Sequence, residues 1–210
     1  MKPDDIYKLA GKEFTFLINS GFKPYKKESL IKETTYGFNS VSILVSDYKT
    51  ELIVEFILGI RINFLEDIMN KFRKINPTLQ NYTKSVMATQ SKILNIDEKE
   101  YKIYSDIDLL TMADSFKEFM EKYGFPFYEK FHNLNNIDKE INIAPDKPCL
   151  LFTDKCIRAM YGILISKAIN SPRYPSLVEI YRGLLSDWNE FDKARFEDLV
   201  SFTNTLNDKN

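Results

Sequence analysis

The sequence predicts an α+β fold: an N-terminal helix packed on an antiparallel meander of three to five strands, followed by an all-helical C-terminal half. Two patterns of hydrophobicity predict it. Residues 28–62 are rich in β-forming and alternating apolar side chains, whereas residues 105–206 place apolar side chains three and four positions apart. The charge changes too, with 16 basic and 13 acidic residues in 1–104 but 13 basic and 17 acidic in 105–210.

The length of 210 residues corresponds to one large domain or two small ones. No Gly-, Pro- or Ser-rich linker separates the sheet-containing half (1–104) from the helical half (105–210), and each half alone would bury a modest core. We therefore expect a single unit over residues 1–210. A hydrophobic content of 44% and a charged content of 28% are typical of globular domains and exclude collagen-like and disulfide-framework classes.

The first helix is expected over residues 4–19. Pro3 and the acidic pair Asp4-Asp5 suit a helix N-terminus, because proline is tolerated in the first turn and acids face the positive end of the helix dipole. Gly21 should end this helix, since glycine readily adopts the left-handed conformation that follows a helix C-terminus.

Strands are expected at residues 28–38, 40–46 and 51–62, and the last two should form a hairpin through the polar residues 47–50. The third strand places Glu55 and Arg61 on one face, and Gly59 indicates a bulge or a close backbone approach. Its opposite face should be buried and carries Leu52, Val54, Phe56, Leu58, Ile60 and Ile62. Two further segments, 82–89 and 100–104, are expected to add strands.

Helix starts are predicted from capping boxes, in which an N-cap side chain and a residue three positions later satisfy each other's backbone amides. Such pairs occur at Asn63 with Glu66, at Ser105 with Asp108 and at Ser176 with Glu179. Gly124 should end the helix that follows Ser105. Further helices are expected from residue 153 and over 191–206, with a short helix and loops over 125–145.

Targeting signals are not evident in the sequence. The N-terminus lacks the apolar segment of a secretory signal. The longest apolar run, 52–62, is interrupted by Glu55 and Arg61 and is shorter than the roughly 20 residues that span a membrane. We therefore expect a cytoplasmic protein without membrane contact, in which Cys149 and Cys156 are reduced thiols.

Residue counts exclude several kinds of catalytic site. No two of the seven glycines lie within five positions of each other, so no G-x-G-x-x-G or Walker A loop exists, and a nucleophile elbow is also absent. His132 is the one histidine; a pair with Cys149 or Cys156 is conceivable, but His132 is better explained as a polar residue on a short helix or loop. We expect no catalytic constellation and no cofactor.

Metal binding has little support in the sequence. The two cysteines would share one histidine, which is too few ligands for a typical zinc site. Asp106 and Asp108 could bind Mg²⁺ or Ca²⁺, but both lie where a helix N-terminus favours negative charge. We expect no metal site.

Glu55 is the best single candidate for an acid–base group, because it lies in the middle of an otherwise apolar strand. A buried carboxyl there would have a shifted pKa. The alternative is that Glu55 points to the solvated face of the sheet together with Arg61.

Residues 123–131 contain five aromatic side chains around Gly124 and Pro126. Aromatic residues in an irregular segment mark recognition surfaces, so Phe125, Phe127 and Tyr128 are the candidate binding residues. The alternative is that these rings fasten the helical layer to the sheet.

Basic residues cluster with aromatic ones at 23–27 and 71–74, a composition found in nucleic-acid patches and equally in solvated surfaces. The net charge of −1 argues against a general nucleic-acid binder, because such proteins usually carry a large basic excess.

A helix ending in Gly21-Phe22-Lys23, a strand meander and a later Tyr-Gly-Phe-Pro-Phe segment (123–127) resemble bacterial α+β proteins of unknown function, some of them immunity-protein-like. The resemblance covers about residues 12–131 and transfers no catalytic residue. It implies a non-enzymatic, protein-binding module, immunity-like or regulatory. The alternatives are an enzyme or small-ligand binder with an Asp/Glu/Tyr/Lys site and a weak nucleic-acid binder. The oligomeric state is left open.

Overall fold

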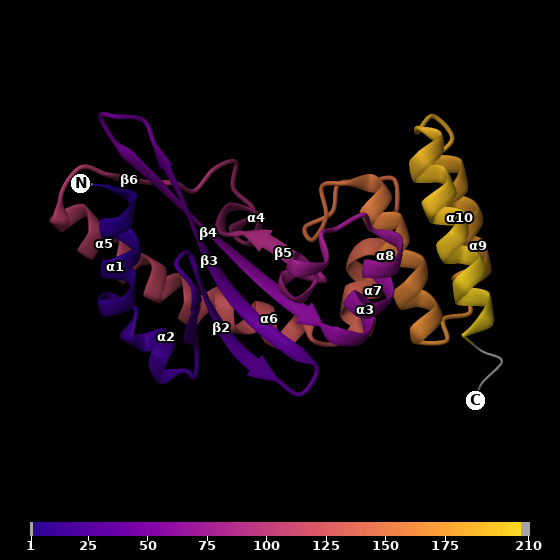
Figure 1. The fold of residues 1–210 in the computed structure, drawn as a ribbon, viewed down its shortest axis with the longest axis horizontal. Helices are drawn as coiled ribbons and strands as arrows, with labels where there is room; N and C mark the ends of the chain where they lie inside the picture. The colour runs from indigo at the N-terminus through magenta and orange to yellow at the C-terminus, as the bar shows by residue number, and fades with distance from the viewer. Residues whose placement is uncertain (1, 207–210) are drawn as a thin grey trace. The chain divides into compact units, whose positions relative to one another are not determined.

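The computed structural model describes residues 2–206 and has the predicted α+β fold, with an N-terminal helix, an antiparallel sheet and a helical C-terminal part (Figure 1). The chain forms two compact units: residues up to Arg61 with Met87–Lys130, and Ile62–Val86 with the residues from Phe131 onward. These units do not coincide with the halves 1–104 and 105–210, because the helical segment up to Lys130 belongs to the unit that contains most of the sheet. The expectation of one domain stays a prediction.

The first unit contains most of the sheet and the helices that accompany it (Figure 1). Its sheet runs in the order β1-β2-β3-β4-β5, with β6 paired antiparallel to the start of β4. The last residue of β4, the first of β5 and the last of α6 are assigned to the second unit. The elements are α1 (Pro3–Glu13), α2 (Thr15–Asn19), β1 (Lys23–Lys26), β2 (Ser29–Thr34), β3 (Gly37–Asp47), β4 (Leu52–Ile62), β5 (Val86–Thr89), α4 (Gln90–Leu94), β6 (Tyr101–Ile103), α5 (Asp106–Phe119), the π-helical turn η2 (Met120–Gly124) and α6 (Phe125–Phe131).

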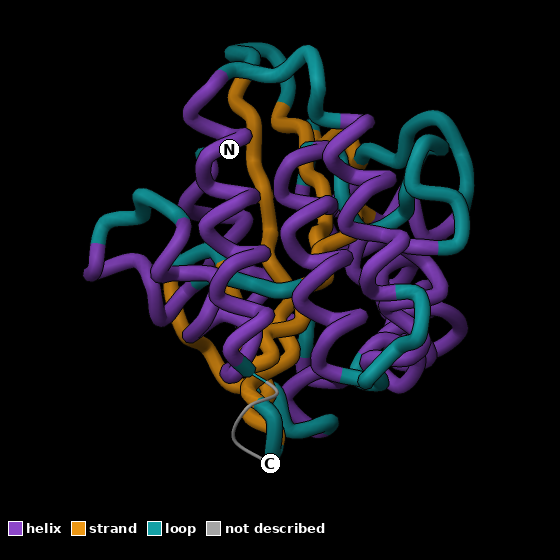
Figure 2. Tube along the Cα trace, turned by 90° about the vertical axis from the view of Figure 1, so that its right-hand side faces the viewer, coloured by secondary structure: helices purple, strands orange, loops and turns teal. Residues whose placement is uncertain are grey.

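The second unit is helical and has α8 at its centre: α7, α9 and α10 all pack on α8, and α3 contacts α8 as well. Figure 2 shows the helices and strands of the chain from a second side. Ten of the fourteen residues of α8 are buried, as the broad apolar face of this segment predicts. The elements are α3 (Asn63–Phe72), the 3-10 helix η1 (Pro77–Tyr82), α7 (Leu134–Asn142), α8 (Lys155–Ala168), α9 (Tyr174–Leu184) and α10 (Glu190–Thr205).

The central strand β4 is confirmed. All six even-numbered side chains predicted on its core face are buried. Phe56 among them stacks on Phe116 of α5, with ring centroids 3.6 Å apart, and contacts the rings of Phe14 and Tyr101. These aromatic contacts form the core between the sheet and the helices of the first unit.

The helix expected over 4–19 is interrupted at Phe14, which separates α1 from α2. The side chain of Phe14 is 1% exposed and packs on Phe116 at 5.3 Å, so burial of this ring accompanies the break. Gly21 has the predicted left-handed backbone, with φ of 89°, and the amide of Phe22 donates to the carbonyl of Leu17 at 3.0 Å.

The single strand expected over 28–38 is wrong. The structure has two strands there, β2 and β3, joined at Thr35-Tyr36, with Thr34 paired to Gly37. The turn was missed because Thr and Tyr are not the residues that usually mark two-residue hairpins. Strand β1 was also missed, since its four residues are all exposed and have no apolar alternation. The strand expected over 82–89 is shorter, because η1 occupies the residues up to Tyr82.

The three capping boxes have different outcomes. The Ser105–Asp108 box is present. The Asn63–Glu66 box is wrong, because α3 follows β4 directly and Glu66 is buried. The Ser176–Glu179 box is also wrong: α9 begins earlier, and the Ser176 hydroxyl donates to the carbonyl of Arg173.

Gly124 does not end a helix, in contrast to the prediction: the chain continues through η2 into α6. An added Cβ at Gly124 would lie 2.5 Å from Sδ of Met120 and 3.4 Å from Cδ1 of Leu58. Gly124 therefore permits close packing against the sheet. The next helix, α8, begins after Asp154, whose side chain accepts from the amide of Ile157.

Two helical glycines of the second unit provide a matched prediction. An added Cβ at Gly162 would lie 2.6 Å from Oδ1 of Asn142 and 2.7 Å from the hydroxyl of Tyr181, whereas Gly183 has no neighbour within 4 Å. We expect Gly162→Ala to lower the free energy of unfolding by about 1–3 kcal/mol through overpacking. Gly183→Ala should raise it by up to about 1 kcal/mol through helix propensity. Chemical denaturation of both variants measures this, and equal shifts would contradict the packing around Gly162.

Candidate functional site

Glu55 lies on the face of β4 opposite the core and is half-buried. Its carboxylate acts on that of Glu100: the pKa of Glu100 is raised first by desolvation, then by Glu98 and also by Glu55. Arg61, expected on the same face, is buried. Glu55 thus lies in an acidic neighbourhood, and its role as a buried acid stays a prediction.

The candidate binding residues of the aromatic segment differ in exposure. Phe127 and Tyr128 are 4% and 3% exposed, whereas Phe125 is half-buried and Tyr123 reaches the surface. The Tyr128 hydroxyl donates to the carbonyl of Ser40 at 2.7 Å, and burial raises the pKa of Tyr128 well above its usual value. Phe127 and Tyr128 therefore pack within the first unit, and a binding role stays a prediction that rests on Phe125.

The residues considered for catalysis or metal binding differ in their surroundings. His132 is exposed, while Cys156 is buried and its pKa is raised by burial to about 11. Asp108 accepts from the backbone amides of Tyr104 and Ser105, so its carboxylate caps α5. Within the described residues, no group of three or more His, Cys, Asp or Glu side chains is arranged to hold a metal ion.

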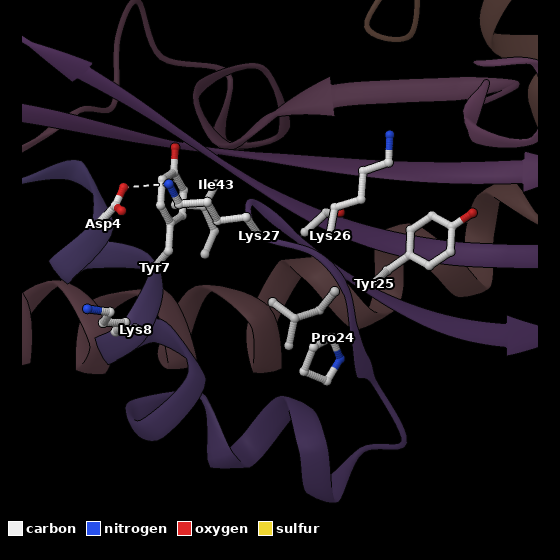
Figure 3. A pocket seen from close by; sticks show the side chains of 10 residues that line it. Asp4, Tyr7, Lys8, Pro24, Tyr25, Lys26, Lys27 and Ile43 are labelled. Atoms are coloured by element: carbon white, nitrogen blue, oxygen red, sulfur yellow. Dashed lines mark hydrogen bonds and ion pairs between the residues drawn. The ribbon is translucent and has the colours of Figure 1, made fainter. Parts of the chain in front are cut away.

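The first unit contains a groove in which tyrosine and lysine side chains surround an apolar floor (Figure 3). We call it the Tyr–Lys groove. Its volume is about 560 Å³, and buried Leu30 and Ile43 form part of its floor. Its lining residues are Asp4, Tyr7 and Lys8 of α1, Pro24, Tyr25 and Lys26 of β1, Lys27 of the turn between β1 and β2, Ser29 and Leu30 of β2, and Ile43 of β3.

Two local features place these side chains around the groove. Asp4, Tyr7 and Lys8 are spaced by three and four positions, so they share one face of α1. The exposed strand β1 is at the edge of the sheet, and its proline and lysines are typical of edge strands that avoid further pairing. The sequence had indicated the basic cluster 23–27, but not that α1 would lie beside it.

Charge in the groove is predominantly positive, with three lysines against Asp4. Asp4 forms an ion pair with Lys27, whose ammonium nitrogen also lies 5.4 Å from the ring centroid of Tyr7. This ion pair lowers the pKa of Asp4 and raises the pKa of Lys27. Glu28 lies outside the lining but acts on both Tyr7 and Lys27.

The groove is suited to binding an anion with an apolar part. Burial is the main cause that raises the pKa of Tyr7, so its hydroxyl is protonated at neutral pH and can donate a hydrogen bond. Lysine ammoniums supply charge, tyrosine rings supply flat contact area, and Leu30 with Ile43 supplies an apolar base. None of the described lining residues is a histidine or a cysteine, which could act as a nucleophile or as a base near neutral pH.

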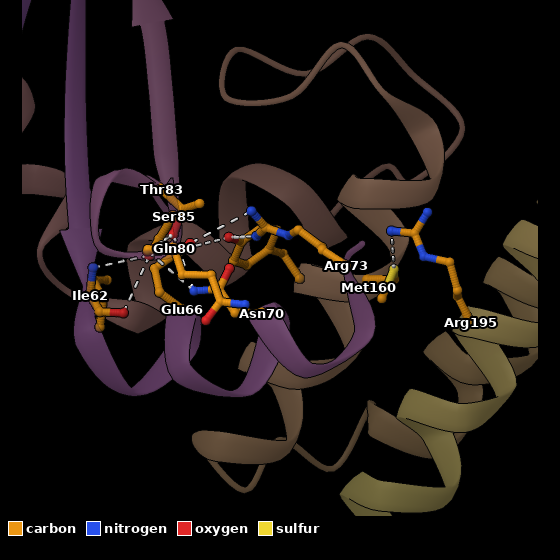
Figure 4. A network of polar contacts seen from close by, with 10 residues as sticks. Ile62, Glu66, Asn70, Arg73, Gln80, Thr83, Ser85, Met160 and Arg195 are labelled. Carbon is orange, nitrogen blue, oxygen red and sulfur yellow. Dashed lines mark hydrogen bonds and ion pairs between the residues drawn. The ribbon is translucent and has the colours of Figure 1, made fainter. Parts of the chain in front are cut away.

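A second polar cluster lies inside the second unit and was missed in the sequence (Figure 4). Glu66 of α3 is completely buried and accepts hydrogen bonds from the hydroxyls of Tyr161 and Ser85. Arg73 donates to the Tyr161 hydroxyl and lies 3.6 Å from the second carboxylate oxygen of Glu66. Burial is the main cause that raises the pKa of Tyr161 well above its usual value. These contacts connect α3 with α8, which gives the cluster a structural role.

The second basic segment, 71–74, does not form a patch like the groove. Lys71 lies over the ring of Phe202 at 5.2 Å, and Lys74 lies over the ring of Phe191 at 4.6 Å. Arg73 is directed into the buried cluster. Lys71 and Lys74 thus contact aromatic rings, and Arg73 contacts a buried acid. These are the cations that the sequence analysis considered as a nucleic-acid patch.

Comparison with known proteins adds no family to these observations. No protein-family model matches the chain, and neither a curated protein nor a solved structure matches it. Among the residues that the structure describes, no helix combines the length and the apolar character needed to cross a membrane.

Proposed function

We propose that this protein is a non-enzymatic binding module of the bacterial cytoplasm, immunity-like or regulatory, whose Tyr–Lys groove takes an acidic segment of a partner protein. The carrying observation is that three lysines and two tyrosines line one groove together with Leu30 and Ile43. Acidic side chains of the partner would face the ammoniums while its apolar side chains contact Leu30 and Ile43. The free thiols of Cys149 and Cys156 are compatible with a reducing compartment.

The form of the groove favours a peptide segment held by its side chains. Lys27 is 57% exposed in its side chain, so the groove is open, as a surface for an extended segment must be. Addition of a strand to β1 is disfavoured, because Pro24 lacks a backbone N–H and reduces the hydrogen bonds that the edge can make. The net charge of −1 and the engaged cations of 71–74 argue against nucleic acid.

Binding of a labelled peptide that alternates Glu and Leu tests this proposal, with a Lys/Leu peptide as its charge-reversed partner. We expect the acidic peptide to bind and the basic one not to bind. The double variant Lys26→Gln/Lys27→Gln should weaken binding by about tenfold, since each exposed ion pair contributes up to about 1 kcal/mol. Added salt should weaken wild-type binding more than the binding of this variant.

The matched control is Lys12→Gln/Lys32→Gln, which removes the same charge from exposed lysines outside the groove lining. Its affinity for the acidic peptide should stay close to that of the wild type. Equal weakening by both double variants, or equal binding of both peptides, would contradict a specific acidic site.

A small anionic ligand is the second candidate, because about 560 Å³ lies in the range of small-molecule sites. The lysine variants should weaken both kinds of ligand, so a competition experiment distinguishes the two. A metabolite extract that competes with the acidic peptide in the wild type, and loses this effect after removal of compounds below about 1 kDa, would favour the small ligand.

A further inference from the structure

One acidic side chain is built into the Tyr–Lys groove at the position where an anion would bind (Figure 3). Oδ1 of Asp4 accepts a hydrogen bond from the ammonium of Lys27, and this ammonium also lies 5.4 Å from the ring centroid of Tyr7. Asp4 is one turn before Tyr7 and Lys8 on the same face of α1. The Tyr7 ring attracts the ammonium of Lys27, and this ammonium is the anion subsite that Asp4 occupies.

The charges around this subsite explain why Asp4 holds it. Lys27 is the main cause that lowers the pKa of Asp4, and Lys8 and Lys2 lower it further. Asp4 is therefore ionised at neutral pH and compensates part of the positive charge. Of the lining residues that the structure describes, Asp4 carries the one negative charge.

We infer that Asp4 is a stand-in for the partner's carboxylate: it occupies Lys27 in the free protein and must be displaced when an acidic segment binds. This inference rests on the proposed function of the groove. It makes Asp4 a specificity-determining residue, since a lone carboxylate gains little by replacing another carboxylate on Lys27. A segment with several acids gains contacts to Lys8 and Lys26 in addition.

The displacement is feasible because the ion pair is exposed. The side chains of Asp4 and Lys27 are 59% and 57% exposed, and exposed pairs of this kind contribute little to stability. Asp4 can therefore leave Lys27 without unfolding α1. Displacement of Asp4 therefore affects the affinity for acidic segments and has little effect on stability.

Asp4→Asn tests the inference, because it keeps the size of the side chain and removes the competing charge. We expect this variant to bind the Glu/Leu peptide about two- to fivefold more tightly, and a peptide with one Glu to gain at least as much. Asp5→Asn is the matched control: Asp5 is in the same first turn and exposed, but it accepts from the backbone amide of Lys2 and does not line the groove. Its affinity should remain that of the wild type.

A double variant, Asp4→Asn/Lys27→Gln, determines whether Asp4 acts through Lys27. We expect the gain from Asp4→Asn to disappear when Lys27 is already replaced. An equal gain in affinity from Asp5→Asn, or a gain from Asp4→Asn that persists when Lys27 is replaced, would mean that only the net charge matters. Either result would overturn the inference. Weaker binding by Asp4→Asn would also overturn it, by showing that Asp4 positions Lys27 for the ligand. If neither the wild type nor Asp4→Asn binds any acidic peptide, the proposed function itself fails.

Discussion

Replacing Arg73 by leucine is expected to lower the free energy of unfolding by about 3–5 kcal/mol, because it leaves the buried Glu66 carboxylate without its cation. The side chain of Arg73 is 12% exposed and that of Glu66 is completely buried, so water cannot replace the lost charge. The variant also loses the hydrogen bond to the Tyr161 hydroxyl and the contact with its ring. Urea denaturation followed by circular dichroism measures the change.

Arg182 provides the matched control. It forms ion pairs with Glu179 and Glu197 on the surface of the second unit, with 40% of its side chain exposed. Arg182→Leu should therefore cost at most about 1 kcal/mol. A loss from Arg73→Leu that is no larger than the loss from Arg182→Leu would show that the buried cluster is hydrated and contributes little.

Adding Glu66→Gln to Arg73→Leu separates the charge from the packing. If the cost arises from an uncompensated buried carboxylate, the double variant should recover part of the lost stability, because glutamine is neutral and still accepts from Ser85. A further loss of stability in the double variant would assign the cost to packing of the Arg73 side chain.

Truncating Phe56 to alanine is expected to cost about 3–5 kcal/mol, which is the range for buried aromatic residues. Phe56 is fully buried, stacks on Phe116 and contacts Phe14, so the truncation removes contacts that hold α5 and the end of α1 against the sheet. The thermal unfolding midpoint and the urea midpoint should both fall.

Phe64→Ala is the control for this prediction, because Phe64 is 43% exposed at the start of α3. It should cost no more than about 1 kcal/mol. An unchanged denaturation midpoint for Phe56→Ala would contradict the assignment of β4 as the central strand.

The features that were predicted correctly depend on residues that are close together in the sequence. Strand β4 was predictable because a period of two puts one set of side chains on one face, whatever the strand pairs with. The Ser105 box and the left-handed Gly21 were predictable for the same reason: their hydrogen bonds connect residues within a few positions of each other. The Thr35-Tyr36 turn was not predicted, because threonine and tyrosine are not typical turn residues.

The residues whose roles were predicted wrongly are those that contact residues far away in the sequence. Glu66 had the spacing of a capping residue, yet its carboxylate accepts a hydrogen bond from the hydroxyl of Tyr161, 95 positions later. Gly124 had the sequence context of a helix end, yet it provides room against Leu58. Burial of Phe127 and Tyr128 likewise depends on how α6 packs, which composition does not determine.

By itself, the sequence determined the α+β class, the core strand, most helices and the exclusion of glycine-rich phosphate loops, because these depend on periodicity and residue spacing. Only the tertiary structure decided that α1 lies next to the turn that follows β1, which brings Asp4 and Tyr7 to Lys27 and creates the groove. The physical reason is that hydrophobic burial selects which elements pack together. Exposed polar side chains such as Asp4 and Lys27 are carried into proximity by that packing and leave little pattern of their own in the sequence.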